Sequence, residues 1–188
     1  STLWVQQVFV EVRWRHALLT LGSKAQPMAL KDGQLSTGNQ ALGINARPIP
    51  EVRLSLPRYW IVPFTHRWLR LKGHVAYGKP TDSGWQKRFT QEQHRYTQGA
   101  LYHSKAGYVM IGNPERQVPF SVELGLEMAT QFGGTSYLKQ NGSMEVVHNS
   151  ASPRAFWHAF FPAGSDATDG SFTNKEGNHL GAWLMRYN

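Results

Sequence analysis

The sequence predicts an all-β protein: an antiparallel, up-and-down transmembrane β-barrel, or a partial barrel of about seven or eight strands, with long surface loops and one short helix near residues 153–161. Three observations lead to this prediction. Apolar and polar residues alternate over long stretches, the connections between these stretches alternate in length, and aromatic residues lie near the expected strand ends.

The longest alternating stretch runs from Phe120 to Phe132. Its even positions are apolar apart from Thr130, and its odd positions are mostly polar, as expected for a strand with two different faces. At about 3.3–3.4 Å per residue the stretch spans roughly 43 Å. Strands of soluble domains usually have about 3–10 residues, whereas a tilted strand that crosses a bilayer needs about 9–11. The length therefore raises the question whether the apolar face meets a protein core or lipid.

Further alternation predicts six more strands, at residues 3–14, 17–24, 41–56, 68–78, 101–112 and 181–187. Pro48 and Pro50 interrupt the third of them, where a bulge or an unpaired edge is expected. The connections run short, long, intermediate, long, short, long, at residues 15–16, 22–40, 57–67, 79–99, 113–118 and 133–180. Short turns at one rim and long loops at the other are typical of an up-and-down barrel.

One helix is expected within the last long connection. Ser152 and Pro153 have the N-cap and first-turn signature of a helix start. In the same connection, Asn141, Gly142 and Ser143 are interpreted as a turn. Four aromatic residues of the helix segment share one helical face, which we interpret as a plug or docking contact rather than a ligand site: Phe156, Trp157, Phe160 and Phe161.

Composition excludes one class of membrane protein and leaves another open. The 188 residues contain no run of 18 apolar residues, and the mean hydropathy is −0.45. This excludes a transmembrane helix but not a barrel, whose strands have one polar face. The chain begins without Met or a signal-peptide pattern, and we expect residues 1–188 to be a single β-barrel segment internal to a longer chain. Cysteine is absent, which excludes disulfides and thiolate metal sites.

The net charge of +8 favours anionic partners such as acidic polysaccharide, lipid phosphate or nucleic acid. The sequence has no lysine-rich arm, and its charges are scattered along the expected strands. Nucleic acid is therefore not expected as a partner. The eight His residues show no metal-ligand spacing, and phosphate- or dinucleotide-binding motifs are missing, so no metal and no cofactor are expected.

Several ordered pieces of the chain resemble the capsule assembly Wzi-like family of outer-membrane barrels. They are Asn45–Arg53, Lys72–Gly78, Trp85–Lys87, Ile111–Arg116, Gln131–Gly134 and Gly177–Gly181. The resemblance implies a large β-barrel in the bacterial outer membrane, in contact with its lipid. It also implies a role in holding or organising capsular polysaccharide in a lectin-like way, without catalysis. Barrels of this family need many more strands than the seven expected from this sequence.

A basic row on one expected strand is the first candidate ligand site. Arg70, Lys72 and His74 are spaced about 6.7 Å apart on one face. Together with Arg53 they could line a polar lumen and attract an acidic glycan. The alternative is a lumen face whose cations form ion pairs with Glu51, Glu123 and Glu127, since polar lumens are normal in such barrels.

Glu123 and Glu127 are counted among the ligand-binding candidates rather than as catalytic residues. Four residues along one strand separate them by about 13 Å, whereas the paired carboxylates of glycosidases lie roughly 5–9.5 Å apart. The pair alone therefore does not fit glycosidase chemistry. Either residue could still pair with a carboxylate on another strand. No catalytic residue is expected.

The connection 79–99 combines aromatic and basic residues, among them Trp85, Lys87 and Arg88. An aromatic ring can stack on the apolar face of a sugar, and Lys or Arg can meet a sugar carboxylate. The alternative is packing within the loop, together with an aromatic girdle at the membrane interface.

Two other functions stay open. A soluble β-sandwich or jelly-roll carbohydrate-binding module would bury its apolar strand faces in a core. An envelope glycan-processing enzyme would bring acid and base groups together from separate strands. Aromatic residues near strand ends favour the barrel, because barrels have aromatic girdles at both interfaces; these residues are Trp4, Trp14, Trp68 and Tyr77.

Overall fold

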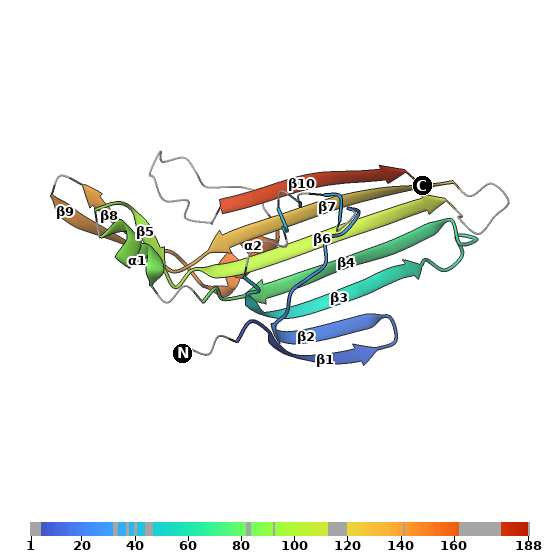
Figure 1. Ribbon diagram of the computed structural model, residues 1–188, viewed down its shortest axis with the longest axis horizontal. Coiled ribbons are helices and arrows are strands. Elements are labelled where there is room, and N and C mark those ends of the chain that lie inside the picture. The colour runs from blue at the N-terminus through green and yellow to red at the C-terminus, as the bar shows by residue number, and fades with distance from the viewer. Residues whose placement is uncertain are drawn as a thin grey trace. The chain divides into compact units, whose positions relative to one another are not determined.

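The computed structural model describes residues 5–31, 34–36, 38–39, 41–43, 47–81, 84–91, 93–112, 120–140, 142–161 and 178–187. Seven strands form one sheet, in which every strand lies beside the next one in the order (Figure 1): β1 (Val8–Trp14), β2 (Ala17–Ser23), β3 (Pro50–Ile61), β4 (Leu69–Gly78), β6 (Leu101–Gly112), β7 (Ser121–Phe132) and β10 (Asn178–Tyr187). A second sheet and two helices make up the rest: β5 (Tyr96–Gln98), β8 (Thr135–Gln140) and β9 (Ser143–His148), with α1 (Trp85–Thr90) and α2 (Pro153–Phe160).

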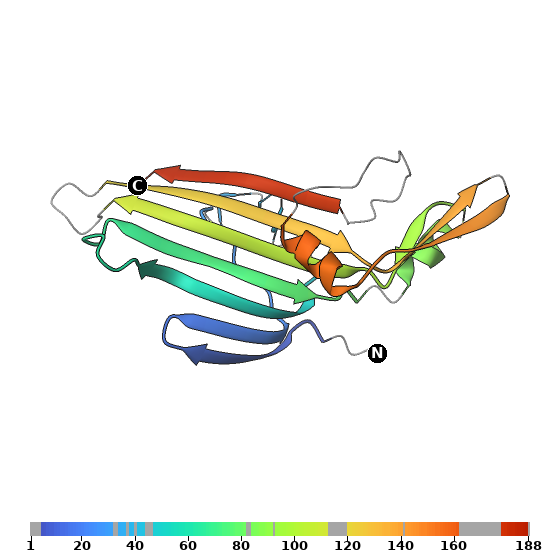
Figure 2. The ribbon, with the colours of Figure 1, turned by 180° about the vertical axis from the view of Figure 1, so that it is seen from behind.

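The predicted all-β, mostly antiparallel class is confirmed. Successive strands of the large sheet run in opposite directions in both views (Figures 1 and 2). The register places Leu19 of β2 opposite Val12 of β1 and Leu54 of β3, so one apolar row crosses three strands. In the described part of the chain the strand order is open, with β1 and β10 at its edges, and no closed barrel is formed.

Two expected strand boundaries were wrong. The first strand begins at Val8, not at residue 3. The third begins at Pro50, not at residue 41, and continues past Pro57 to Ile61. Proline is tolerated at the first position of a strand, because its missing N–H then interrupts no ladder. The Ser23 hydroxyl donates to the Pro48 carbonyl oxygen at 2.7 Å, which fixes the entry to β3. Residues 44–46 of the expected strand lie outside the described residues.

The predicted alternation of short and long connections is confirmed. The connections between strands of the large sheet are residues 15–16, 24–49, 62–68, 79–100, 113–120 and 133–177. Two long ones contain more regular structure than predicted, since only the helix near residues 153–161 was expected in them. Residues 79–100 contain α1 and β5, and residues 133–177 contain the β8–β9 hairpin and α2. Gly142 at the hairpin turn has a φ of 82°, a conformation that suits glycine and closes a tight turn.

The chain divides into two compact units. The first comprises residues 1–77, 104–129 and 180–188, and the second comprises residues 78–103 and 130–179. In the first unit, described residues of the segment 24–43 lie on one face of the sheet, where Leu30 packs against Ala106 and Tyr108. A Cβ at Gly125 would stand 2.5 Å from the Tyr108 ring and 3.2 Å from Leu30 Cδ1, so glycine leaves the room that these two side chains occupy.

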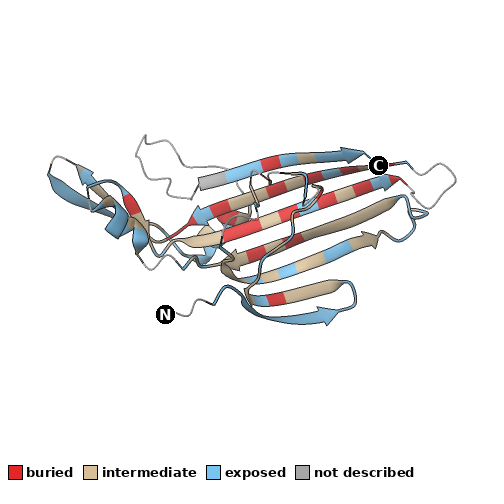
Figure 3. Cartoon of the chain, in the orientation of Figure 1, coloured by how far each residue is buried: buried red, intermediate tan, exposed pale blue. Residues whose placement is uncertain are grey.

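The large sheet buries its polar face and exposes its apolar face. Along β6 and β7, buried residues alternate with half-buried or exposed ones (Figure 3). Glu123 is 0% exposed and Glu127 is 1% exposed, whereas Leu124 between them is exposed. The apolar row of the Phe120–Phe132 stretch is therefore exposed or half-buried from Phe120 to Met128, and it is buried at its end, where Phe132 packs against Phe156.

In the second unit, α1 lies against β5 and α2 has its own packing. The backbone N–H of Thr97 in β5 donates to Gln86 Oε1 of α1 at 3.2 Å. Tyr96 stacks on Tyr137 of β8 with ring centroids 4.8 Å apart. The predicted helix start at Ser152 is confirmed, since its hydroxyl oxygen accepts from the backbone N–H of Ala155. No helix in the described ranges is long and apolar enough to cross a membrane.

Candidate functional site

The polar face of the first unit centres on Glu123. The Tyr59 hydroxyl donates to its Oε2 at 2.5 Å, and Arg186 Nε donates to its Oε1 at 2.9 Å. Arg186 also donates through Nη2 to the same oxygen, so Oε1 accepts two charge-assisted hydrogen bonds from one guanidinium group while Oε2 accepts from Tyr59. The carboxylate is fully buried, so these charge-assisted hydrogen bonds replace the hydration that it loses. Strands β3, β7 and β10 each contribute one residue to this cluster.

Glu127 forms a second cluster, four residues further along β7 on the same face. The Tyr108 hydroxyl and the Asn39 amide both donate to its Oε1, at 2.6 Å and 2.7 Å. Asn39 lies in the segment 24–43, so this contact ties that segment to the sheet. Within the described structure, Glu127 Oε2 and Asn39 Oδ1 are buried without a hydrogen-bond partner. This end of the network can therefore still accept hydrogen bonds from a small donor group.

Lys72 connects the two clusters. Its ammonium group lies over the rings of Tyr59 and Tyr108, 5.0 Å and 4.9 Å from their centroids. A cation over an aromatic face is attracted by the negative charge density of the ring. The two tyrosines that hold Lys72 are the ones that donate to Glu123 and Glu127. The polar face is therefore a connected network rather than a row of separate charges.

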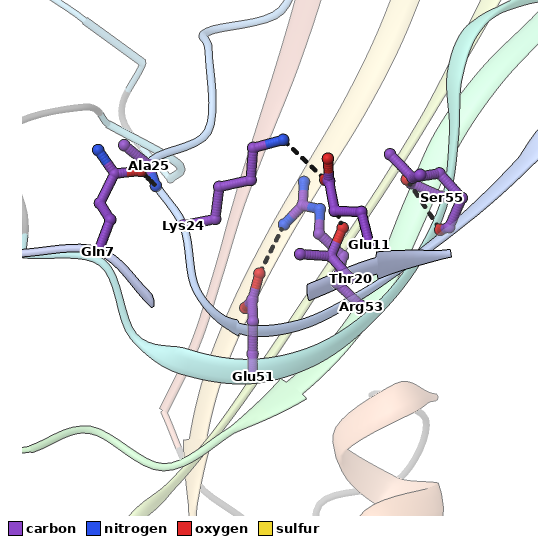
Figure 4. A network of polar contacts seen from close by, with 9 residues as sticks. Gln7, Glu11, Thr20, Lys24, Ala25, Glu51, Arg53 and Ser55 are labelled. Carbon is purple, nitrogen blue, oxygen red and sulfur yellow. Dashed lines mark hydrogen bonds and ion pairs between the residues drawn. The ribbon is translucent and has the colours of Figure 1, made fainter. Parts of the chain in front are cut away.

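The other predicted residues of the basic row have different surroundings. His74 is buried on β4, with Nε2 3.4 Å from the Ser104 hydroxyl. Arg70 lies half-buried on the same strand. Arg53 pairs with Glu51 at 3.1 Å (Figure 4), as the alternative interpretation of the row expected. Nearby, Glu11 accepts hydrogen bonds from Lys24 and Thr20 on the polar face of β1 and β2.

Helix α1 of the second unit carries the remaining predicted residues. Trp85, Lys87 and Arg88 are all exposed, and the neighbouring Phe89 is more exposed still. The rings of Trp85 and Phe89 have centroids 5.8 Å apart. Because Gln86 holds the helix against β5, the aromatic and basic side chains are left at the surface. This combination of rings and cations can stack on a sugar and meet its carboxylate.

The predicted residues thus fall into two groups. Lys72, Glu123 and Glu127 join one network in the first unit, with Arg53, Arg70 and His74 elsewhere on strands β3 and β4. Trp85, Lys87 and Arg88 share one helix of the second unit. In the described ranges no three His, Asp or Glu residues are grouped so that they could hold a metal ion.

The sequence analysis missed four members of the network: Asn39, Tyr59, Tyr108 and Arg186. Tyr59 was assigned to a connection because Pro57 suggested the end of a strand. The odd positions Arg53, Ser55 and Tyr59 nevertheless continue the polar row of β3, a signal that could have found it. Asn39 offered no such signal, because its position depends on how a long connection folds back.

Comparison with known proteins gives no relative from which to argue. The chain matches no protein-family model, no curated protein and no solved structure.

Proposed function

We propose that this chain forms part of the wall of an outer-membrane β-barrel. We further propose that its surface segments bind an acidic polysaccharide, such as a capsular glycan, without catalysing its conversion. The observation that carries the proposal is the reversed polarity of the large sheet, which buries charged residues and exposes apolar ones. The role with capsular polysaccharide rests on the family resemblance of the six sequence pieces.

The exposed apolar residues lie on β1, β2 and β3 at one side of the sheet and on β6, β7 and β10 at the other, while the odd-numbered apolar residues of β4 in the middle are half-buried. Burying apolar surface is worth about 25 cal/mol per Å², so a water-facing sheet of this kind forgoes much of its possible stabilisation. In a bilayer the same face is matched by lipid chains, and the polar face belongs to the lumen. The exposed residues include Val8, Val10, Val12, Trp14, Leu21, Val52, Leu54, Leu124, Trp183, Met185 and Tyr187.

Aromatic residues at the short-connection end of the sheet support a membrane interface there. Trp14 ends β1, Phe120 precedes β7, and Tyr187 ends β10; all three are exposed and continue the apolar rows of their strands. Tryptophan and tyrosine are enriched where a barrel meets the interface, because their rings are apolar but carry a polar group. Among the other aromatic residues noted in the sequence, Trp4 lies outside the described residues and Tyr77 is half-buried.

The open strand order fits a wall rather than a whole barrel. As edge strands, β1 and β10 each present one side without a ladder partner in the described sheet. Exposed edges of this kind favour pairing with another strand, and barrel closure removes them. We therefore expect further strands to complete the barrel at both edges.

Membrane fractionation of the full-length parent protein tests the barrel. We expect it in the outer-membrane fraction, extractable by detergent only, with a gel mobility that shifts when the sample is boiled, since folded barrels resist SDS until heated. A protein that is soluble without detergent and shows no shift would sink the proposal. A soluble sugar-binding module would then replace it.

Glycan binding is tested separately on the detergent-purified protein by calorimetry with an acidic and a neutral polysaccharide. We expect Trp85→Ala to weaken binding of the acidic glycan several-fold, because a stacking ring is lost. Trp157→Ala is the control, as Trp157 is likewise an exposed tryptophan and lies on the other helix of the same unit. Equal loss in both variants, or binding that ignores the charge of the glycan, would argue against the α1 site.

A further inference from the structure

Helix α2 and the residue after it leave several aromatic side chains partly exposed to solvent. Its fully buried residue is Ala159. On the packed side, Phe160 lies 5.7 Å from the ring of His103, and Phe156 meets Phe132 edge-on at 5.0 Å. These contacts attach the helix to the first residues of β6 and the last residue of β7. The helix is held firmly while part of its apolar surface remains uncovered.

The uncovered side is a stripe of one basic and two aromatic residues. Arg154, Trp157 and Phe161 follow each other at spacings of three and four residues, which places them on one helical face. Trp157 is 64% exposed, and Phe161 is also exposed. The two rings contact each other with centroids 4.7 Å apart, and Arg154 Nε donates to His158 Nε2 at 3.2 Å. The stripe is thus a preformed aromatic surface with a basic margin.

The position of α2 on its strands links it to the apolar face. Phe132 is the last member of the even-numbered apolar row of β7, and His103 lies on the odd-numbered row of β6 that includes the exposed Ile111. Within the second unit, His103 and Phe132 are both buried where α2 packs on them. These strand ends belong to the long connections, opposite along β7 to the end marked by Phe120.

We propose that α2 is an interfacial anchor, whose Trp157–Phe161 surface lies in the headgroup layer of a membrane with anionic lipid phosphates. The proposal rests on the barrel function proposed above, and it assigns to α2 the second aromatic belt, at the long-connection ends of the strands. Tryptophan and phenylalanine bury their rings at the boundary of headgroups and acyl chains. Arg154 and His158 at the margin suit the phosphate groups of the lipid.

Cysteine labelling tests this anchor directly, because the 188-residue sequence contains no cysteine. Single variants Phe161→Cys, Leu54→Cys and Trp85→Cys carry an environment-sensitive dye in the otherwise intact protein. The protein is reconstituted in vesicles of phosphatidylcholine and phosphatidylglycerol that contain nitroxide lipids, with the quencher either at the headgroup or deep in the acyl chain. All three positions are exposed. Phe161→Cys gives up the ring contact with Trp157 and Trp85→Cys the one with Phe89, while the contacts of α2 with Phe132 and His103 are kept.

We expect the dye at position 161 to lose several-fold more emission to the headgroup quencher than the dye at position 85. The dye at position 54 should respond most to the deep quencher. If position 54 is quenched and position 161 is not, the anchor is refuted while the barrel stands; a protein partner on α2 would give that result. If neither position is quenched, the barrel proposal itself falls.

Discussion

The two faces of the large sheet follow opposite rules. One face buries Glu123 and Glu127 and half-buries Lys72 in a network of hydrogen bonds and cation–π contacts, to which Asn39 of the segment 24–43 also belongs. The other face exposes Leu54, Trp183 and their neighbours. In a soluble domain the apolar face would be the buried one. The buried face thus combines charged and polar side chains with small and apolar ones such as Ala106 and Met110, while many of the larger apolar side chains of the other face are exposed. A polar inner face and an apolar outer face are the arrangement expected when lipid is the outer solvent.

The largest expected effect comes from removing the buried carboxylate of the polar face. Glu123→Ala leaves Tyr59 and Arg186 without their acceptor. The Arg186 side chain is 43% exposed, so water can hydrate it, and the cost is that of two lost hydrogen bonds to a charged group, about 1.5–3 kcal/mol each. We expect the free energy of unfolding in detergent, measured by urea titration, to fall by about that amount. Glu11→Ala is the control: its pair with Lys24 is partly exposed, and such pairs contribute at most about 1 kcal/mol. If the two variants lost the same free energy of unfolding, the buried Glu123 cluster would be no more important for stability than the partly exposed Glu11 pair.

A charge on the apolar face distinguishes lipid from water as its solvent. Leu54→Arg is expected to cost about 2–4 kcal/mol when the protein folds into a bilayer, because an arginine at mid-membrane is poorly solvated. In a water-facing sheet the same change at an exposed position would cost almost nothing. The measurement is the fraction folded in vesicles as a function of urea. Arg58→Lys, a change at another exposed position of β3 that keeps the charge, is the control. No difference between the two would mean that lipid does not contact Leu54.

Release of the segment 24–43 is the third test. Asn39→Ala removes the donor to Glu127 Oε1, and a hydrogen bond to a charged group is worth about 1.5–3 kcal/mol. We expect faster amide exchange in residues 24–43 and along β7, with the remaining strands unchanged. Gln34→Ala, which removes an exposed amide from the same segment, serves as the control. Unchanged exchange in Asn39→Ala would show that Leu30 packing alone holds the segment.

The smallest expected effect concerns the stability of helix α2. Ser152→Ala removes the N-cap hydroxyl, which is worth about 1 kcal/mol. Amide exchange should speed up in residues 153–160, and the dye at position 161 should lose part of its headgroup quenching. The Ser143→Ala change at the start of β9 should do neither. If quenching at position 161 is unchanged after Ser152→Ala, the contacts with Phe132 and His103 hold α2 in place without the N-cap.

Alternation along the chain predicted the strands of the large sheet but not what lies between them. Phe120–Phe132 has a period that only a strand satisfies, and β7 occupies nearly all of it. The helix start at Ser152 was equally readable, because capping is local. By contrast, α1 and the β8–β9 hairpin are short elements whose patterns are too brief to separate from polar loops. The network members Asn39 and Arg186 come from distant parts of the chain, and their meeting with β7 is decided by tertiary packing.

The contact between Asn39 and Glu127 also has a consequence for the order in which parts of the chain fold. The two residues are 88 positions apart, so the segment 24–43 emerges long before the strand that it must cover. Contacts of high sequence separation form late, because much chain entropy must be lost before they are gained. Before β7 joins the sheet, Lys72 and Tyr59 are exposed to water because Glu123 and Glu127 are not yet in place. We therefore expect the segment 24–43 to pack on the sheet late in folding, and we expect a chain truncated before residue 121 to lack this packing.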